Sequence, residues 1–244
     1  MKNKKLFFSL FTIYYSLFAI HYLSAQQDGK FVFAQLSYSG NWDTRATAWD
    51  KILKFLTVST SVKSISERRI VQIKDEELFW SPFLVVTGDC SFVITDDEIK
   101  ILKKYIQCGG MIFIDDSSNK KDSIFNKSVR NMVNKISPEN PLTRIPISDA
   151  ILKSFYLLQD ISGRVITNKY LEGCKIGDRY SIIYSQNDLL GVWEEDNLGN
   201  YIYSCNDKQR WEAKKMTINI IMYSLTGTYK SDAIHLPFIK SKTR

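Results

Sequence analysis

The sequence predicts an α/β fold, a three-layer sandwich around a mainly parallel central sheet, on three observations. Short apolar runs rich in β-branched residues, such as FLVVTG at 83–88, are typical of strands buried on both faces. These runs alternate with longer segments whose apolar residues recur at helical spacing. A strand, a helix and a strand follow one another within residues 83–114, and such a βαβ unit requires a right-handed crossover and parallel strands.

The first half of the chain supplies the predicted centre of the sheet. Before residue 82 the patterns predict a strand, a helix, a short strand and a helical turn, at 31–38, 46–58, 68–73 and 75–79. After the strand at 83–88, Thr95 and Glu98 form a T-x-x-E capping box that begins a helix. Two glycines end that helix, and MIFI at 111–114 is the next strand.

The second half is less regular. PENPLTRIP holds three prolines and indicates an irregular crossing segment. The patterns predict a helix, a short helix, a β-hairpin and a final amphipathic helix, at 122–135, 149–156, 171–185 and 210–225. His235 is then expected beyond the final helix, in a tail.

The N-terminus has the pattern of a secretory signal. Three lysines precede an apolar run that begins with Leu6 and ends with Leu23, and Ser24 and Ala25 supply small residues before Gln26. The run approaches the length of about 20 residues that spans a membrane, and Leu23 fits a cleavage site poorly, so an uncleaved anchor is the alternative. We therefore divide the chain into a signal peptide or anchor, a single domain and a basic tail, at 1–25, 28–239 and 240–244.

Composition narrows the classes of function. The formal net charge of +7 includes three lysines of the signal, which leaves about +4 (7 − 3) for the mature chain. Basic residues elsewhere alternate with acids, so the charge does not indicate nucleic-acid binding. The cysteines show no C-x-x-C spacing, and the single histidine of the mature chain argues against zinc. A disulfide and free thiols both remain open for Cys90, Cys108, Cys174 and Cys205.

Four separated blocks of the sequence carry a family resemblance: FVFAQLSYSGNW, FWSPFLVVTGDCSFVITDDEIKILKKYIQCGGMIFIDD, DRYSIIYSQNDLLGVWE and INIIMYSLTGTYKSDAIHLPFI. In this order, over residues 31–239, they resemble the bacterial family described as domain of unknown function 4159. The resemblance implies a class I glutamine-amidotransferase-like fold, which is a flavodoxin-like α/β sandwich. Members are often exported or fused to membrane-anchored aerotolerance-type proteins, and they tend to be encoded near AAA-type ATPases and von Willebrand A domains. No established activity comes with the family.

The implied fold allows amidotransferase chemistry to be checked against the sequence. That fold places a nucleophilic cysteine at a tight turn after a central strand, paired with a histidine and a glutamate from late in the chain. Here the turn falls at Asp115 to Ser117 without a cysteine, and His235 lies beyond the predicted final helix. Ser117 without an imidazole is a weak nucleophile. Cys90 also follows a strand, but Asp89 and other nearby acids oppose its ionisation. The sequence therefore predicts no catalytic residue.

Carboxylates at strand ends are the stronger candidates for a site. Asp89, Asp115, Asp116 and the Asn187-Asp188 pair each follow a predicted strand, so parallel neighbouring strands would gather their oxygens at one edge. Such oxygens suit Ca²⁺ or Mg²⁺, with Asp89, Asp116 and Asp188 as the metal set, and no other cofactor is expected. Two alternatives remain: each aspartate caps the following turn or helix, or the carboxylates carry out hydrolysis.

The adjacent aspartates are expected to differ in role, because successive side chains of a strand point to opposite faces. We expect Asp115 to serve the backbone, and Asp116 to be exposed at the edge and the more sensitive of the two for function. Trp42 and Ser117 complete the candidate ligand-binding set. Trp42 is one of several aromatic residues beside predicted loops, which either surround a pocket or fill gaps between loops and helices: Tyr38, Trp42, Trp80, Trp193 and Trp211.

Together these observations favour an exported, non-catalytic domain that binds a ligand or a protein partner in the cell envelope. We expect it in the periplasm, or tethered to the inner membrane by residues 6–23. The alternatives are a divergent metal- or carboxylate-dependent hydrolase and a structural component of a membrane-associated assembly. The sequence predicts no nucleic-acid partner and no membrane span beyond the N-terminal segment.

Overall fold

The computed structural model describes residues 30–242 and has the three layers of an α/β sandwich. Its seven-stranded sheet has the order β2-β1-β3-β4-β7-β6-β5. Strands β2, β1, β3, β4 and β7 run parallel to one another, whereas β6 runs antiparallel to its neighbours β7 and β5. In chain order the strands are β1 Phe33–Leu36, β2 Arg69–Val71, β3 Phe83–Gly88, β4 Met111–Asp116, β5 Thr143–Arg144, β6 Glu172–Ile176 and β7 Arg179–Ser185.

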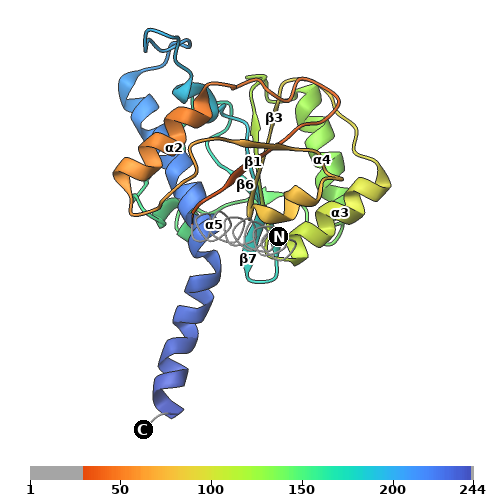
Figure 1. Ribbon diagram of the computed structural model, residues 1–244, viewed down its shortest axis with the longest axis vertical. Helices are drawn as coiled ribbons and strands as arrows, with labels where there is room; N and C mark the ends of the chain where they lie inside the picture. The colour runs from red at the N-terminus through yellow and green to blue at the C-terminus, as the bar shows by residue number, and fades with distance from the viewer. Residues whose placement is uncertain (1–29, 243–244) are drawn as a thin grey trace, which may run out of the picture.

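Helices cover both faces of the sheet. Helices α2 and α5 pack on one face, and α3 and α4 pack on the other (Figure 1). The α-helices are α2 Ala48–Ser59, α3 Asp96–Gln107, α4 Ile124–Ile136 and α5 Asp207–Lys242. Three short 3₁₀ helices complete the described elements: η1 Glu76–Trp80, η2 Ala150–Lys153 and η3 Leu190–Trp193.

Strand β4 shows why its sequence is apolar without interruption. Met111 and Phe113 lie in the core on the side of α2 and α5, while Ile112 and Ile114 lie in the second core on the side of α3 and α4. Both faces of the strand are buried, so both sets of side chains must be apolar. The predicted α/β fold with a mainly parallel sheet is confirmed.

The helix starts follow from local hydrogen bonds. Thr95 and Glu98 form the predicted capping box at α3. Ser123 accepts a hydrogen bond from the backbone N–H of Asn126 at 2.8 Å and so caps α4. Helix α2 has no cap from its own N-cap side chain. Glu194, which is distant in sequence, instead accepts from the first N–H groups of this helix.

In the second half of the chain, one prediction holds only in part and another is wrong. The short helix expected at 149–156 is a 3₁₀ helix limited to Ala150–Lys153, because the following residues turn to meet α5 through Asn219. The final helix does not stop at 225, so His235 lies within the backbone span of α5 rather than in a tail. Helical hydrogen bonds are local, so a helix can continue beyond the point where the apolar spacing of its sequence ends. Side chains after Thr226 are not described.

Two edges of the sheet matter for function. The carboxyl edge is formed by the ends of β1, β3, β4 and β7, and the amino edge by their beginnings. Lys30 and Leu225 line one cavity, so the chain enters the domain and α5 leaves it at the amino edge. The expected signal segment at 1–25 lies outside the described residues. Within 30–242 no helix is long and apolar enough to cross a membrane.

Candidate functional site

The candidate carboxylates lie at the carboxyl edge, as the order of the parallel strands predicts. Strands β3, β4 and β7 are neighbours, and each is followed directly by a candidate residue or ends in one. Asp115 and Asp116 close β4, and both are fully buried. Their side chains enter different sides of the sheet, so the two carboxylates have separate surroundings.

Asp115 serves the backbone, as expected. Its carboxylate accepts hydrogen bonds from the N–H groups of Leu189 and Leu190, at 3.0 and 2.8 Å, where the chain turns after β7. Burial and then the nearby charge of Asp188 raise the pKa of Asp115 to about 8, against these hydrogen bonds and one to Ser185, which lower it. The bonds hold the chain that leads from β7 into η3.

Asp188 is the centre of a buried ionic cluster. It has a left-handed backbone with φ of 51°, which aspartate tolerates better than most residues. Its Oδ1 and Oδ2 accept from Nε and Nη2 of Arg45 at 2.7 and 2.6 Å, in a bidentate pair. Nε of Arg164 donates to the same Oδ2. A Cβ atom added at Gly191 would lie 2.5 Å from this oxygen, so the backbone approaches closely on the remaining side.

Tyr203 connects the two arginines. Its ring lies 4.6 Å from the guanidinium of Arg45 and 4.8 Å from that of Arg164. Arg45 also donates to the Tyr203 hydroxyl at 3.1 Å. Burial opposes the charged form of Arg45, but the hydrogen bond and charge of Asp188 outweigh it and raise the pKa of Arg45. The cluster therefore joins four segments that are distant in the sequence, at residues 45, 164, 188 and 203.

Asp116 contradicts the expectation of an exposed, ligand-facing carboxylate. It accepts from the N–H of Ser118 at 2.8 Å, from the Ser123 hydroxyl at 2.7 Å and from the Tyr184 hydroxyl at 3.3 Å. Burial and then the charge of Asp116 raise the pKa of Tyr184, which keeps this hydroxyl protonated as a donor. The turn after β4 folds over the carboxylate, because Asp116 supports both that turn and the cap of α4.

Ser117 and Asn187 also have structural partners. The Ser117 hydroxyl lies 2.9 Å from both the carbonyl oxygen of Gly88 and the hydroxyl of Thr44. Asn187 accepts from the N–H of Asn168 and donates to its carbonyl oxygen, at 2.8 and 2.7 Å. Residues 30–226, whose side chains are described, contain no histidine that could activate Ser117.

The proposed metal set is not brought together. Asp89 accepts from Asn41 at 2.9 Å, apart from the buried partners of Asp116 and the two arginines of Asp188. Within residues 30–242 no three His, Cys, Asp or Glu side chains are grouped in a way that could hold a metal ion. The prediction of converging oxygens holds only for Asp115 and Asp188.

The aromatic residues do not surround one pocket. Trp193 is buried in the core, whereas Trp80 is largely exposed beside η1. Trp42 is half-buried, with Arg68 over its ring at 5.9 Å and its carbonyl oxygen accepting from Gln35 at 2.9 Å. Gap filling is the better description for Trp42 and Trp193.

All four cysteines are free thiols. Cys90 is exposed, and its hydrogen bond to Asp89, followed by the Asp89 charge, raises the pKa of the thiol. This disfavours the thiolate that a nucleophile needs. Burial raises the pKa of Cys174, whose thiol donates to the carbonyl oxygen of Asn140.

Sequence reasoning missed Arg45, Arg164 and Tyr203. Arg45 and Arg164 lie 143 and 24 residues from Asp188 in the sequence, and no local pattern links them. The only available signal was the position of Arg45 in the SGNWDTR loop directly after β1, which leads to the carboxyl edge.

Comparison with known proteins adds the family. No curated protein matches the chain significantly. The family model Domain of unknown function (DUF4159) matches residues 32–225, which includes every strand of the sheet and both sides of the ionic cluster. Because this match covers most of the chain, the protein belongs to the DUF4159 family.

Proposed function

We propose that this protein is an exported, non-catalytic module of the cell envelope, with a class I glutamine-amidotransferase-like fold, that binds a protein partner at its carboxyl edge. One contrast carries the proposal. The polar side chains within this edge are occupied by internal bonds, while a hairpin that projects above them exposes apolar side chains.

The occupied polar groups argue against catalysis. A general acid, base or nucleophile must be able to reach a substrate and change its bonding. Asp115, Asp116 and Asp188 are fully buried, and each carboxylate accepts two or more hydrogen bonds from the protein. The hydrolase alternative therefore has no free carboxylate pair at the described edge. The proposal requires no cofactor.

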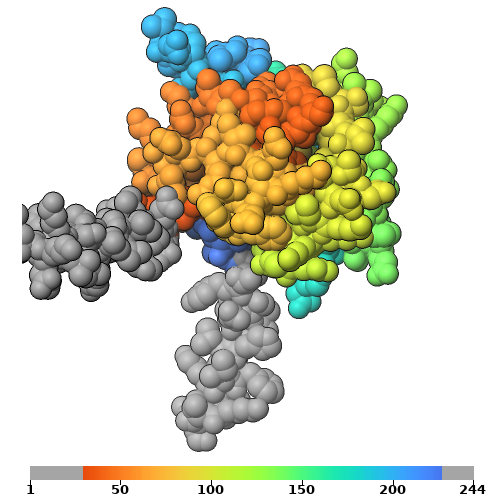
Figure 2. Space-filling model, turned by 45° about the vertical axis from the view of Figure 1, so that its right-hand side comes forward, coloured from red at the N-terminus to blue at the C-terminus, as the bar shows by residue number. Residues whose placement is uncertain are grey.

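The projecting segment is the 194–203 hairpin, which stands above the surface in Figures 1 and 2 (light blue, at the top). Glu195 and Tyr201 form an antiparallel bridge, and the N–H of Ile202 donates to the carbonyl oxygen of Glu194 at 3.0 Å. The Glu194 carboxylate accepts from the N–H groups of Thr47 and Ala48, both at 2.9 Å. The base of the hairpin is thus joined directly to the start of α2.

Further contacts fix the hairpin on its other side. Glu195 forms an ion pair with Lys51 of α2 at 2.8 Å. Arg210 of α5 donates to the carbonyl oxygen of Tyr203 at 2.7 Å and lies over the ring of Tyr201 at 3.7 Å. A segment held in this way loses little conformational entropy when a partner binds it.

The exposed part of the hairpin has the composition of an interface anchor. Leu198 is 87% exposed, Ile202 50% and Tyr201 45%. Apolar and aromatic side chains that are presented by a rigid base are the residues from which interfaces gain most of their binding energy. A flat or concave apolar surface on a protein fits them better than a small polar ligand does.

Site-specific photo-crosslinking in cells tests the proposal. A photoreactive residue at position 198 should give one adduct of defined mass, and Ile202→Asp should abolish that adduct. The matched control is position 58, because Val58 is 79% exposed on α2. No adduct at position 198, the same adduct at both positions, or an adduct that survives Ile202→Asp would each reject binding through the hairpin.

A further inference from the structure

The opposite edge of the molecule has different chemistry. Lys30, the first described residue, lies at the amino edge, and α5 passes the same edge near Leu225 on its way to Lys242 (Figure 1). In the sequence, Lys30 follows the apolar run 6–23 after only six residues. Both the entry and the exit of the domain therefore lie on the side away from the 194–203 hairpin.

The amino edge is predominantly basic. Exposed or half-buried cations at the strand beginnings and the helix ends form no ion pair with another described residue, and they outnumber the acids beside them. The cations are Lys30, Lys63, Lys103, Lys175 and Arg179, and the acids are Glu67, Glu139, Asp149 and Asp178. Near the carboxyl edge, the acids Asp89 and Asp196 are accompanied by the exposed lysines Lys120 and Lys121, so that surface shows no comparable excess of positive charge.

Lysines at this edge border apolar hollows. A cavity of about 440 Å³ is lined by Phe31, Val62 and Leu225, with Lys30 and Lys63 among its other lining residues. Both lysines are exposed. An apolar floor with ammonium groups beside it matches the boundary between the headgroups and the acyl chains of a bilayer.

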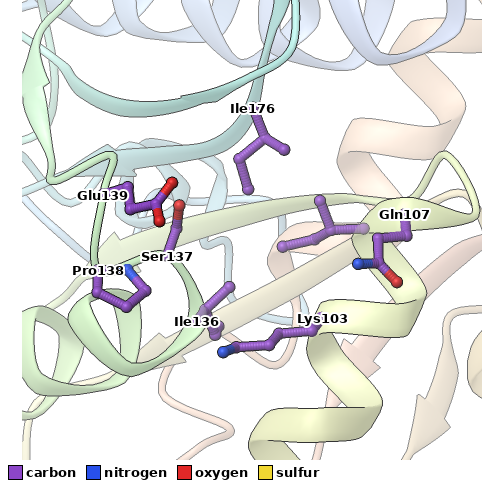
Figure 3. Close-up of a pocket in the computed structure, with 8 residues that line it drawn as sticks. Lys103, Gln107, Ile136, Ser137, Pro138, Glu139 and Ile176 are labelled. Carbon is purple, nitrogen blue, oxygen red and sulfur yellow. The ribbon is translucent and has the colours of Figure 1, made fainter.

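A second hollow at the same edge combines apolar side chains with one lysine and one glutamate. This cavity, of about 250 Å³, lies between the ends of α3 and α4. Lys103 lies beside Ile136, and Gln107 lies across the cavity from Pro138 and the carboxylate of Glu139 (Figure 3). Two such hollows on one edge suit an extended surface better than a single bound molecule.

The segment before Lys30 favours the same occupant if it serves as an anchor. If residues 6–23 stay in the membrane as an anchor, the six residues before Lys30 reach at most about 20 Å, which is six times about 3.4 Å per residue.

We propose that the amino edge binds the surface of an anionic phospholipid bilayer, with Lys30 and Lys63 at the level of the lipid phosphates. Basic residues near an anionic bilayer each contribute to binding, and the effect falls off within a Debye length. This orientation directs the 194–203 hairpin away from the bilayer and toward the partner. The proposal does not depend on that partner, since a different edge of the protein carries it.

Two native cysteines allow a test with the full chain. Cys108 is exposed at the amino edge, and Cys90 is exposed at the carboxyl edge. In a Cys205→Ser background, Cys90→Ser or Cys108→Ser leaves one exposed thiol for a fluorophore. The labelled chain is reconstituted through its N-terminal segment into vesicles that contain nitroxide-labelled lipid. The vesicles are either pure phosphatidylcholine or about 30% phosphatidylglycerol.

The expected result is stronger quenching of the Cys108 probe in the anionic vesicles, with the Cys90 probe unchanged. Lys30→Glu together with Lys63→Glu should lower the ratio of docked to undocked protein by at least about fivefold for each lysine. Lys120→Glu with Lys121→Glu, exposed positions after β4, is the matched control and should have no effect. Equal quenching of the Cys108 probe in both vesicles, quenching of Cys90 instead, or an effect that survives the Lys30 and Lys63 changes would overturn the proposal.

Discussion

At Asp188 one carboxylate neutralises two guanidinium groups, and the side chains of Arg45 and Asp188 are only 7% and 0% exposed. Asp188→Asn would leave both arginines with no formal negative charge in contact, so we expect it to lower the free energy of unfolding by about 3–5 kcal/mol. Denaturant unfolding measures this loss. Asp97→Asn is the control, because Asp97 and Lys100 form a solvent-exposed pair whose contribution to stability should be small. Equal effects of the two substitutions would show that the cluster does not stabilise the fold.

Asp115 gives stability a pH dependence. Its folded pKa of about 8 lies above the unfolded value of about 3.9, so the folded state binds more protons between these values. The resulting stabilisation is complete below about pH 4 and is lost as the pH rises toward 8, with a slope of at most about 1.4 kcal/mol per pH unit. The amide resonances of Leu189 and Leu190, which donate to this carboxylate, should titrate near pH 8 in NMR spectra. Resonances that stay constant from pH 5 to 9 would contradict the raised pKa.

Divalent cations test the remaining ligand hypothesis at these residues. The oxygens of Asp116 and Asp188 already accept hydrogen bonds from protein groups, so we expect millimolar Ca²⁺ or Mg²⁺ to leave the thermal unfolding of wild type unchanged. A site with a dissociation constant a hundredfold below the ion concentration would instead add about 2.7 kcal/mol. A rise in Tm of that origin that disappears in Asp116→Asn would restore the metal site.

How much of this site the sequence could predict depends on the distance between partners. Strand alternation correctly separated Asp115 from Asp116, because it is a property of neighbouring residues. The exposure of Asp116 was predicted wrongly, since Tyr184, which helps to enclose it, is 68 residues away. Arg45 was missed for the same reason. The sequence supports the location of a polar cluster at the carboxyl edge, but the pairing within it is a tertiary property.

At the scale of elements, the helix caps differ in burial and should therefore differ in energy. Thr95 caps α3 at an exposed position, with the Glu98 N–H at 3.3 Å from its hydroxyl. Ser123 caps α4 while buried, and its hydroxyl also donates to Asp116. We expect Thr95→Ala to cost about 1 kcal/mol and Ser123→Ala about 2 kcal/mol or more, because the second change also removes a charge-assisted bond from a buried carboxylate. Urea unfolding of both variants compares them, and a larger loss for Thr95→Ala would refute the ranking.

The elements that the sequence predicted well are those whose signals are local. The capping box of α3 and the apolar run of β4 were predicted with nearly correct bounds. Strand β5 was not predicted, because its two exposed residues carry no periodic pattern and depend on pairing with β6. The cap of α2 by Glu194 also escaped prediction, since it joins residues 146 and more positions apart.

For the whole molecule, the form of the N-terminus decides how the amino edge meets the membrane. We expect export with removal of residues 1–25, because basic, apolar and small residues follow one another in the order of a secretory signal. The first described residue is Lys30, so cleavage after Ala25 would leave four residues before it and would remove no part of the described sheet. The intact mass of the protein recovered from envelope fractions shows whether residues 1–25 have been removed. A wash at high salt should release the cleaved form, because the Debye length falls to about 3 Å at 1 M. A full-length species that resists the salt wash would show that Leu6 to Leu23 is an anchor, and the basic amino edge would then orient a tethered domain rather than recruit a soluble one.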